Sequence, residues 1–278
     1  MTEESWKIAA SAGGRAGLEA IVADPARALI ASDFDGTLAA IVPEPADARG
    51  YPGAARALAA LARTVGTVAI ITGRPAGDAV TLGGFGDVGG LIVLGHYGAE
   101  RWQDGQIAAA PEPDGVAAVR AILPGTLAAA GAADGTRIED KGTALAVHTR
   151  QAADPQGELE RLREPVESLA ASNGLGVEPG RFVLEIRPDG TDKGAALRQL
   201  ARERGATSVL FCGDDLGDLA AFAAIRELRA EGMPGCAVAS RSPETPQVAT
   251  AADLVVDGPA GVVELLSTLA DLSSRPAE

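Results

Sequence analysis

The sequence has few aromatic residues and few cysteines, and it lacks any long apolar run. Aromatics make up 3% of the 278 residues, so the core must be built from Ala, Val, Leu and Ile. Cys212 and Cys236 are too few for a disulfide scaffold, and we expect two buried thiols in a reducing compartment. No apolar run reaches the roughly 18 residues that a spanning helix needs, so no membrane partner is expected.

Cations are scarce as well. Lys and Arg number 24 against 38 Asp and Glu, which gives a formal net charge of −14. This balance argues against nucleic acid as a partner, because phosphate backbones are bound by clustered Lys and Arg. A small phosphorylated ligand stays compatible, since a metal ion and a few cations reverse the field locally. The N-terminal residues lack a signal-peptide pattern, so we expect a cytoplasmic protein. We separately expect a monomer.

Two carboxylates follow the first apolar run of the chain. Residues 28–31 read A-L-I-A, which has the length and composition of a buried parallel strand. Asp33 and Asp35 come just after it, and Gly36 turns the chain. Ligands of open α/β sheets bind at the carboxyl ends of strands, where two acids suit a hard cation and a phosphate. An acidic turn with helix-capping residues would use the same residue types.

A second strand ends in groups that suit a phosphate. A helical run begins after Gly53, and the apolar strand 67–71 follows it, which predicts a parallel strand–helix–strand unit. Thr72, Gly73 and Arg74 therefore lie at the same sheet edge as the two acids, where a hydroxyl, an N–H and a guanidinium can hold phosphate oxygens. An N-capping threonine at a strand-to-helix turn is the alternative.

A third apolar strand and a polar turn occupy residues 91–102, and residues 103–115 have the composition of a connection. His96 and Glu100 lie beyond that strand. A single histidine is more often structural than catalytic, but the chain has only two, so we include His96 among the candidate substrate-contacting residues.

The middle of the chain has a different pattern, in the order α-β-β-α-β-β. This order predicts an antiparallel sheet with two helices on one face. The expected elements are helices over 116–130 and 158–172, the latter broken before Pro165, and strand pairs around turns at 141–142 and 179–180. We therefore predict that residues 109–187 form a small α+β domain inserted into a discontinuous α/β domain, residues 1–108 and 188–278.

A second acidic cluster follows the strand that ends at residue 213. Asp214, Asp215 and Asp218 join Asp33 and Asp35 as acids beyond strand ends, and gathering so many like charges is unfavourable without a cation. An acidic helix N-terminus explains one or two of these residues, but not a second cluster. Because the ligands would all be oxygen atoms, we predict that all five bind Mg2+ rather than zinc.

Lys193 is placed against its electrostatic preference. It opens a predicted helix, where the helix dipole disfavours a cation. Pairing with Asp33 and with a transferring phosphate would compensate for this cost, so we assign Lys193 to the catalytic group.

Several segments together resemble one family. The strings D-F-D-G-T-L, I-T-G-R, V-L-G-H-Y-G-A-E, I-E-D-K-G, V-L-E-I-R-P, D-K-G-A-A-L and G-D-D-L-G-D, spread over residues 28–258, are similar to those of trehalose-6-phosphate phosphatases in the haloacid dehalogenase superfamily. The resemblance implies a Rossmann-like parallel-sheet core with an inserted α+β cap that sets substrate specificity. It also implies magnesium-dependent hydrolysis of trehalose 6-phosphate to trehalose and phosphate, a step of trehalose biosynthesis.

The resemblance also implies roles for individual residues. Asp33 would be the nucleophile and form an aspartyl-phosphate, and Asp35 would protonate the leaving alcohol and then deprotonate the water. In the cap, Glu139, Lys141 and Glu185 would hydrogen-bond the sugar hydroxyls. Two alternatives stay open: a phosphatase for another sugar phosphate, such as sucrose phosphate or mannosyl-3-phosphoglycerate, and a non-catalytic sugar-phosphate sensor.

Overall fold

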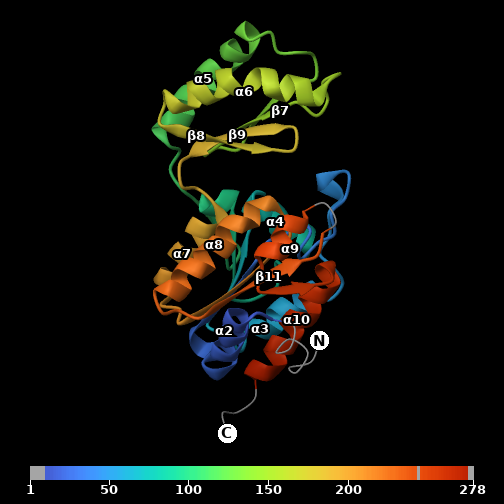
Figure 1. Ribbon diagram of the computed structural model, residues 1–278, viewed down its shortest axis with the longest axis vertical. Helices are drawn as coiled ribbons and strands as arrows, with labels where there is room; N and C mark the ends of the chain where they lie inside the picture. The colour runs from blue at the N-terminus through green and yellow to red at the C-terminus, as the bar shows by residue number, and fades with distance from the viewer. Residues whose placement is uncertain (1–9, 243–244, 275–278) are drawn as a thin grey trace. The chain divides into compact units, whose positions relative to one another are not determined.

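A computed structural model describes residues 10–242 and 245–274. The sequence predicts a short helical segment over residues 1–27, loosened in its middle by Gly13 and Gly14, and its residues 1–9 lie outside the described part. The chain divides into two compact units (Figure 1). The core unit comprises Met1–Ala108 and Asp192–Glu278, and the inserted unit comprises Ala109–Thr191. No helix in the described part of the chain is both long and apolar enough to cross a membrane.

The core unit is built on a sheet with the strand order β12-β11-β10-β1-β2-β3-β4-β5. The pairs from β12 to β3 are parallel, and β4 runs antiparallel to β3. In chain order the strands are β1 (Ala28–Ser32), β2 (Thr67–Ile71), β3 (Leu91–Gly95), β4 (Glu100–Gln103), β5 (Gln106–Ala109), β10 (Ser208–Gly213), β11 (Gly235–Ser240) and β12 (Leu254–Val256). The predicted α/β class with a parallel sheet is confirmed.

Strands β4 and β5 were not predicted. Their residues have the composition of a polar turn and a connection. Trp102 is the only buried residue of β4, and β5, the edge strand, is exposed along its whole length and shows no apolar alternation. Asp104 and Gly105 turn the chain between them with positive φ angles of 51° and 77°.

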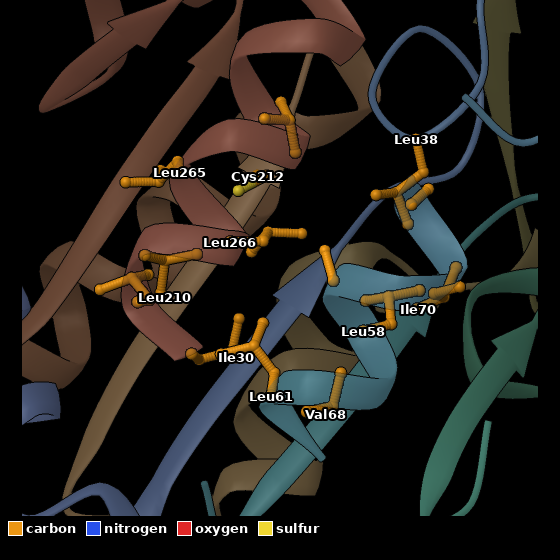
Figure 2. Close-up of a cluster of buried hydrophobic side chains, with 14 of the residues drawn as sticks. Ile30, Leu38, Leu58, Leu61, Val68, Ile70, Leu210, Cys212, Leu265 and Leu266 are labelled. Carbon is orange, nitrogen blue, oxygen red and sulfur yellow. The ribbon is translucent and has the colours of Figure 1, made fainter. Parts of the chain in front are cut away.

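Helices cover both faces of the core sheet, and each face has its own apolar cluster. Because side chains alternate along a strand, Ile30 of β1 packs toward α2, α3 and α10, while Leu29 packs toward α7 and α8 (Figures 1 and 2). Each fully buried Leu or Ile contributes about 1.5–3 kcal/mol. The helices are α2 (Ala12–Ala23), α3 (Ala54–Leu61), α4 (Ala76–Gly83), α7 (Lys193–Arg204), α8 (Leu219–Ala230), α9 (Pro246–Ala251) and α10 (Gly258–Ser273).

Helix α2 runs unbroken through Gly13 and Gly14, which were predicted to loosen it. The Ser11 hydroxyl caps it by accepting from the Gly14 N–H. A Cβ on Gly17 would overlap the Gly235 backbone, so the glycine lets α2 approach β11 closely. This packing explains a glycine that helix propensity alone disfavours.

The inserted unit has the predicted antiparallel sheet with two helices. Its strand order is β6-β7-β9-β8, and α5 packs against α6 over a core that includes Leu145, Leu162 and Leu184. The elements are α5 (Asp114–Ala129), β6 (Arg137–Asp140), β7 (Leu145–His148), α6 (Pro155–Ala171), β8 (Leu175–Gly180) and β9 (Val183–Pro188).

Two local predictions in the inserted unit are wrong. Helix α6 continues through Pro165 because its buried stripe, which includes Leu162 and Val166, outweighs the lost hydrogen bond. The β8–β9 turn lies at Arg181 and Phe182 rather than at 179–180, and Phe182 takes the left-handed conformation with φ 61°.

Candidate active site

The parallel pairing of β10, β1 and β2 brings three acidic or polar strand ends to one edge of the core sheet. Asp33 follows β1, and its backbone N–H donates to the Cys212 carbonyl oxygen of β10 at 2.8 Å. The Asp33 carboxylate is buried and pairs with Lys193, whose Nζ lies 2.9 Å from Oδ2. Lys193 is the first residue of α7, so the pair joins two segments 160 positions apart (193 − 33).

The electrostatics of this pair follow from its burial. Burial raises the pKa of Asp33 well above its usual value; Lys193 opposes this shift, and the aspartates near it add to it. Burial alone would lower the pKa of Lys193, but the carboxylates of Asp218 and Asp33 outweigh it and hold that pKa well above its usual value. The lysine is therefore a fixed cation beside the predicted nucleophile.

Asp218 organises the second acidic turn. Its Oδ1 accepts from Lys193 Nζ at 2.7 Å, and its Oδ2 accepts from the backbone N–H groups of Asp214 and Asp215 at 2.8 and 3.0 Å. Burial raises the pKa of Asp218 to about 6, against the pull of Lys193. Both carboxylate oxygens thus already have partners, which orients the turn and the lysine together.

Asp214 is a further buried carboxylate of this turn. Burial, with Asp218 and Asp215 adding to it, raises the pKa of Asp214 to about 8. The Thr37 hydroxyl donates to Oδ1 at 3.1 Å, and the Thr245 hydroxyl donates to the Asp214 carbonyl oxygen at 2.6 Å. Local sequence gives no signal for Thr245, which reaches this turn from 31 residues away.

The acids fit a hard divalent cation. Asp33, Asp214 and Asp218 each offer an oxygen within 4.8 Å of the others, and all three are buried. Gly36 has φ 68°, and a Cβ there would overlap the Asp214 carboxylate, so the backbone approaches this group as closely as only glycine allows. Buried like charges at this spacing favour a cation between them, and oxygen-only ligation suits magnesium.

The Asp35 and Asp215 side chains lie outside this group of three. The Asp35 carboxylate faces Arg74, whose Nε and Nη2 donate to its two oxygens at 2.6 and 2.7 Å. Asp215 has a side chain that is 57% exposed and lies 3.8 Å from Lys193 Nζ. Burial raises the pKa of Asp215, but Lys193 and hydrogen bonds from Asp218 outweigh it, and the net shift is downward.

Thr72, Gly73 and Arg74 form a turn whose three carbonyl groups are all held by one segment. The Tyr97 N–H donates to the Thr72 oxygen at 3.0 Å, and the His96 N–H donates to the Arg74 oxygen at 3.0 Å. His96 Nδ1 lies 3.2 Å from the Gly73 oxygen. Among the described residues, none accepts a hydrogen bond from the peptide N–H of Gly73. Such a free N–H is suited to an anion.

His96 itself is buried and supports this turn. Because a carbonyl oxygen only accepts, Nδ1 must carry the proton of this hydrogen bond. The ring's Nε2 lies 3.8 Å from Glu100, which also accepts from the Ala76 N–H at 2.9 Å. His96 and Tyr97 have φ angles of 47° and 58°, a conformation that non-glycine residues adopt at a cost. The contact partners of His96 are therefore backbone and Glu100.

The inserted unit gathers its three predicted site residues on one sheet face. Glu139 and Glu185 stand in one cross-strand row, on either side of Ala146. Lys141 Nζ donates to Glu185 Oε2 at 2.8 Å, and His148 Nε2 lies 2.8 Å from Glu139 Oε2. Each carboxylate is thus paired with a basic group that leaves further lone pairs open to hydroxyl donors.

Similarity to known proteins shows the family to which the chain belongs. Residues 31–260 match the model of the trehalose-phosphatase family. The chain belongs to this family. A trehalose-phosphate phosphatase of Mycobacterium avium strain 104 is 34% identical over 252 residues, which cover 87% of this chain and 62% of the relative.

Two further family comparisons concern chain length and fold. An uncharacterized glycosyl hydrolase of Mycobacterium tuberculosis H37Rv is 36% identical over 251 residues, 86% of this chain but 18% of that protein. The chain thus spans only part of these curated relatives. The C-terminal domain of Candida albicans trehalose-6-phosphate phosphatase has the same fold, with a TM-score of 0.72 at 22% identity over 91% of this chain and 95% of that structure.

Proposed function

We propose that the chain hydrolyses trehalose 6-phosphate to trehalose and phosphate through an aspartyl-phosphate on Asp33, with Mg2+ bound. The observation that carries the proposal is the buried Asp33–Lys193 pair, 2.9 Å apart at the end of β1, in a chain of the trehalose-phosphatase family. A buried carboxylate held by one cation is suited to act as a nucleophile, and a buried ion pair is by itself weak evidence of a stabilising role.

The first half of the reaction transfers the phosphoryl group. An Asp33 oxygen attacks phosphorus, the bond from phosphorus to the sugar oxygen breaks, and Asp35 gives its proton to that oxygen. Lys193, the Thr72 hydroxyl and the Gly73 N–H are the groups proposed to stabilise the phosphoryl oxygens. In the second half, water attacks phosphorus, its proton goes to Asp35, and the Asp33–phosphorus bond breaks.

Asp33 and Asp214 would hold the metal, and Asp218 would orient them through its contacts with Lys193 and the Asp214 N–H. A bound Mg2+ supplies positive charge against the phosphoryl oxygens. The mutual closeness of Asp33, Asp214 and Asp218 supports this assignment.

Sugar recognition is proposed to come from the inserted unit. Glu139, Lys141 and Glu185 carry acceptors and donors on one sheet face, which suits the many hydroxyls of a disaccharide. The proposed ligands are a small sugar phosphate, Mg2+ and water. We also propose that the protein is a cytoplasmic monomer. Size-exclusion chromatography with light scattering tests the oligomeric state.

The test is phosphate release from a panel of sugar phosphates with Mg2+. We expect trehalose 6-phosphate to be preferred over sucrose phosphate and mannosyl-3-phosphoglycerate, and Asp33→Asn to abolish release. Glu139→Ala should lower kcat/KM for trehalose 6-phosphate while a small generic phosphate is hydrolysed as before. Preference for another sugar phosphate would overturn the assignment of trehalose 6-phosphate as the substrate. Absence of phosphate release from every sugar phosphate would favour the non-catalytic sensor.

A further inference from the structure

The Arg74 side chain is committed to Asp35. Nε donates to Oδ2 at 2.6 Å and Nη2 donates to Oδ1 at 2.7 Å, which is the parallel two-bond fork of an arginine–carboxylate pair. The sequence predicts that Arg74 binds the phosphate of the substrate. In the structure, its fork holds the acid instead.

The guanidinium is also held from its flat side. It lies 5.6 Å from the centre of the Phe34 ring, which is fully buried and packs edge-on against Phe85 at 6.0 Å. A cation over an aromatic face is attracted by the ring electrons. Phe34 stands between Asp33 and Asp35 in the chain, so the same short segment carries both acids and the platform for Arg74.

The two acids therefore have separate cations. Lys193 holds Asp33 at 2.9 Å, and Arg74 holds Asp35. A lysine is a point charge on a flexible stem, whereas the arginine fork sets the plane in which a carboxylate lies. Asp33, the proposed nucleophile, is buried and needs a compensating positive charge. Asp35, whose side chain is 38% exposed, needs a defined orientation to exchange a proton with a ligand.

We propose that Arg74 is a positioning residue for proton transfer, which orients Asp35 toward the leaving oxygen and does not act chiefly as a phosphate ligand. The proposal rests on the proposed function. A carboxylate has about four lone-pair directions, and the fork occupies two of them. The other two can carry the proton that passes to the sugar oxygen as the phosphorus–oxygen bond breaks. Without the two hydrogen bonds from Arg74, the Asp35 carboxylate can rotate so that these lone pairs no longer face the sugar oxygen.

This role predicts a dependence on the leaving group that phosphate binding does not. A sugar alcohol is a poor leaving group and needs the proton of Asp35, whereas nitrophenolate and acetate leave as stable anions. Misplacing the acid should slow only the first kind of substrate. Positioned acids contribute about 10²–10⁴-fold in rate. Losing a phosphate ligand would slow both kinds alike.

The experiment measures single-turnover release of the leaving group with Mg2+, enzyme in excess, for wild type, Arg74→Ala and Arg74→Lys. The substrates are trehalose 6-phosphate and either p-nitrophenyl phosphate or acetyl phosphate, whichever wild type turns over faster. Arg101→Ala is the matched control, because Arg101 grips both oxygens of Glu203 in the same unit but away from the acids.

For Arg74→Ala we expect about a 100-fold loss with trehalose 6-phosphate and less than about fivefold with the activated ester. Arg74→Lys, which keeps the charge but not the fork, should lose about tenfold with the sugar phosphate. Arg101→Ala should match wild type with both. Equal losses with both substrates, or no loss with either, would overturn the positioning role. If wild type hydrolyses the activated ester but not trehalose 6-phosphate, the proposed function fails instead, and an alkyl phosphate that wild type accepts takes its place.

Discussion

Binding of Mg2+ to the metal-free protein should release protons from Asp214. Burial beside Asp218 and Asp215 raises the pKa of Asp214 to about 8, so this carboxyl is mostly protonated at neutral pH. A divalent cation binds only the carboxylate form and must displace the proton. Metal binding at this site is therefore expected to strengthen as pH rises toward 8.

The magnitude follows from the pKa. With a pKa of about 8, roughly 0.9 of a proton is bound to Asp214 at pH 7 and roughly 0.1 at pH 9. Proton competition weakens the apparent affinity for Mg2+ about tenfold at pH 7 and about 100-fold at pH 6, relative to the fully ionised group. The raised pKa of Asp33 adds to both effects, so these values are lower limits.

Isothermal titration calorimetry in buffers of different ionisation enthalpy measures the protons released. Thr37→Val provides an internal check, because the Thr37 hydroxyl bond lowers the pKa of Asp214 and its loss should extend proton release to higher pH. Asp257→Asn, a change at an exposed carboxylate, should leave the titration unchanged. Release of less than about half a proton at pH 7, or an affinity that is constant from pH 6 to 8, would refute the reasoning.

Three further predictions concern stability and the phosphate turn. Gly36→Ala should weaken Mg2+ binding more than tenfold and lower the melting temperature further than Gly84→Ala, a matched change at φ 66° with no neighbour within 4 Å that reports the conformational cost alone, about 1 kcal/mol. Without metal, the free energy of unfolding should fall as pH rises from 5 to 8, because each carboxyl with a raised pKa, such as Asp214, binds more protons in the folded state than in the unfolded state. Each such carboxyl contributes a fall of up to about 1.4 kcal/mol per pH unit. Urea titrations at several pH values measure the fall, and a rise would contradict it. His96→Ala should free the Gly73 carbonyl and weaken inhibition by inorganic phosphate about tenfold, whereas an unchanged inhibition constant would separate His96 from the phosphate turn.

Much of the core architecture was predictable because its signals are local. The buried strands around Asp33, Thr72 and Asp214 are short apolar runs with turn residues after them, and parallel pairing brings their ends to one edge. The edge strand β5 had no such signal, since exposure removes the apolar alternation. The predicted break before Pro165 was wrong for the opposite reason: the tertiary packing of α6 outweighed the local tendency of proline to end a helix.

The candidate site was predictable in its residue types and in the pair of Lys193 with Asp33, but not in its other pairings. Asp218 is a predicted metal ligand, and only the structure shows that its two oxygens also accept from Lys193 and from two backbone N–H groups. His96 read as a substrate contact, but its ring lies against the Gly73 carbonyl. Each of these contacts depends on which side chains from distant segments the fold brings together.

By itself, the sequence determined the apolar strands, the chemistry at their ends and the family of the chain. Only the tertiary structure decided that Lys193 also pairs with Asp218, that Arg74 pairs with Asp35, and that Lys141 pairs with Glu185. The reason is physical. Strand formation depends on neighbours along the chain, whereas an ion pair depends on distances of a few ångströms between segments that folding alone brings together.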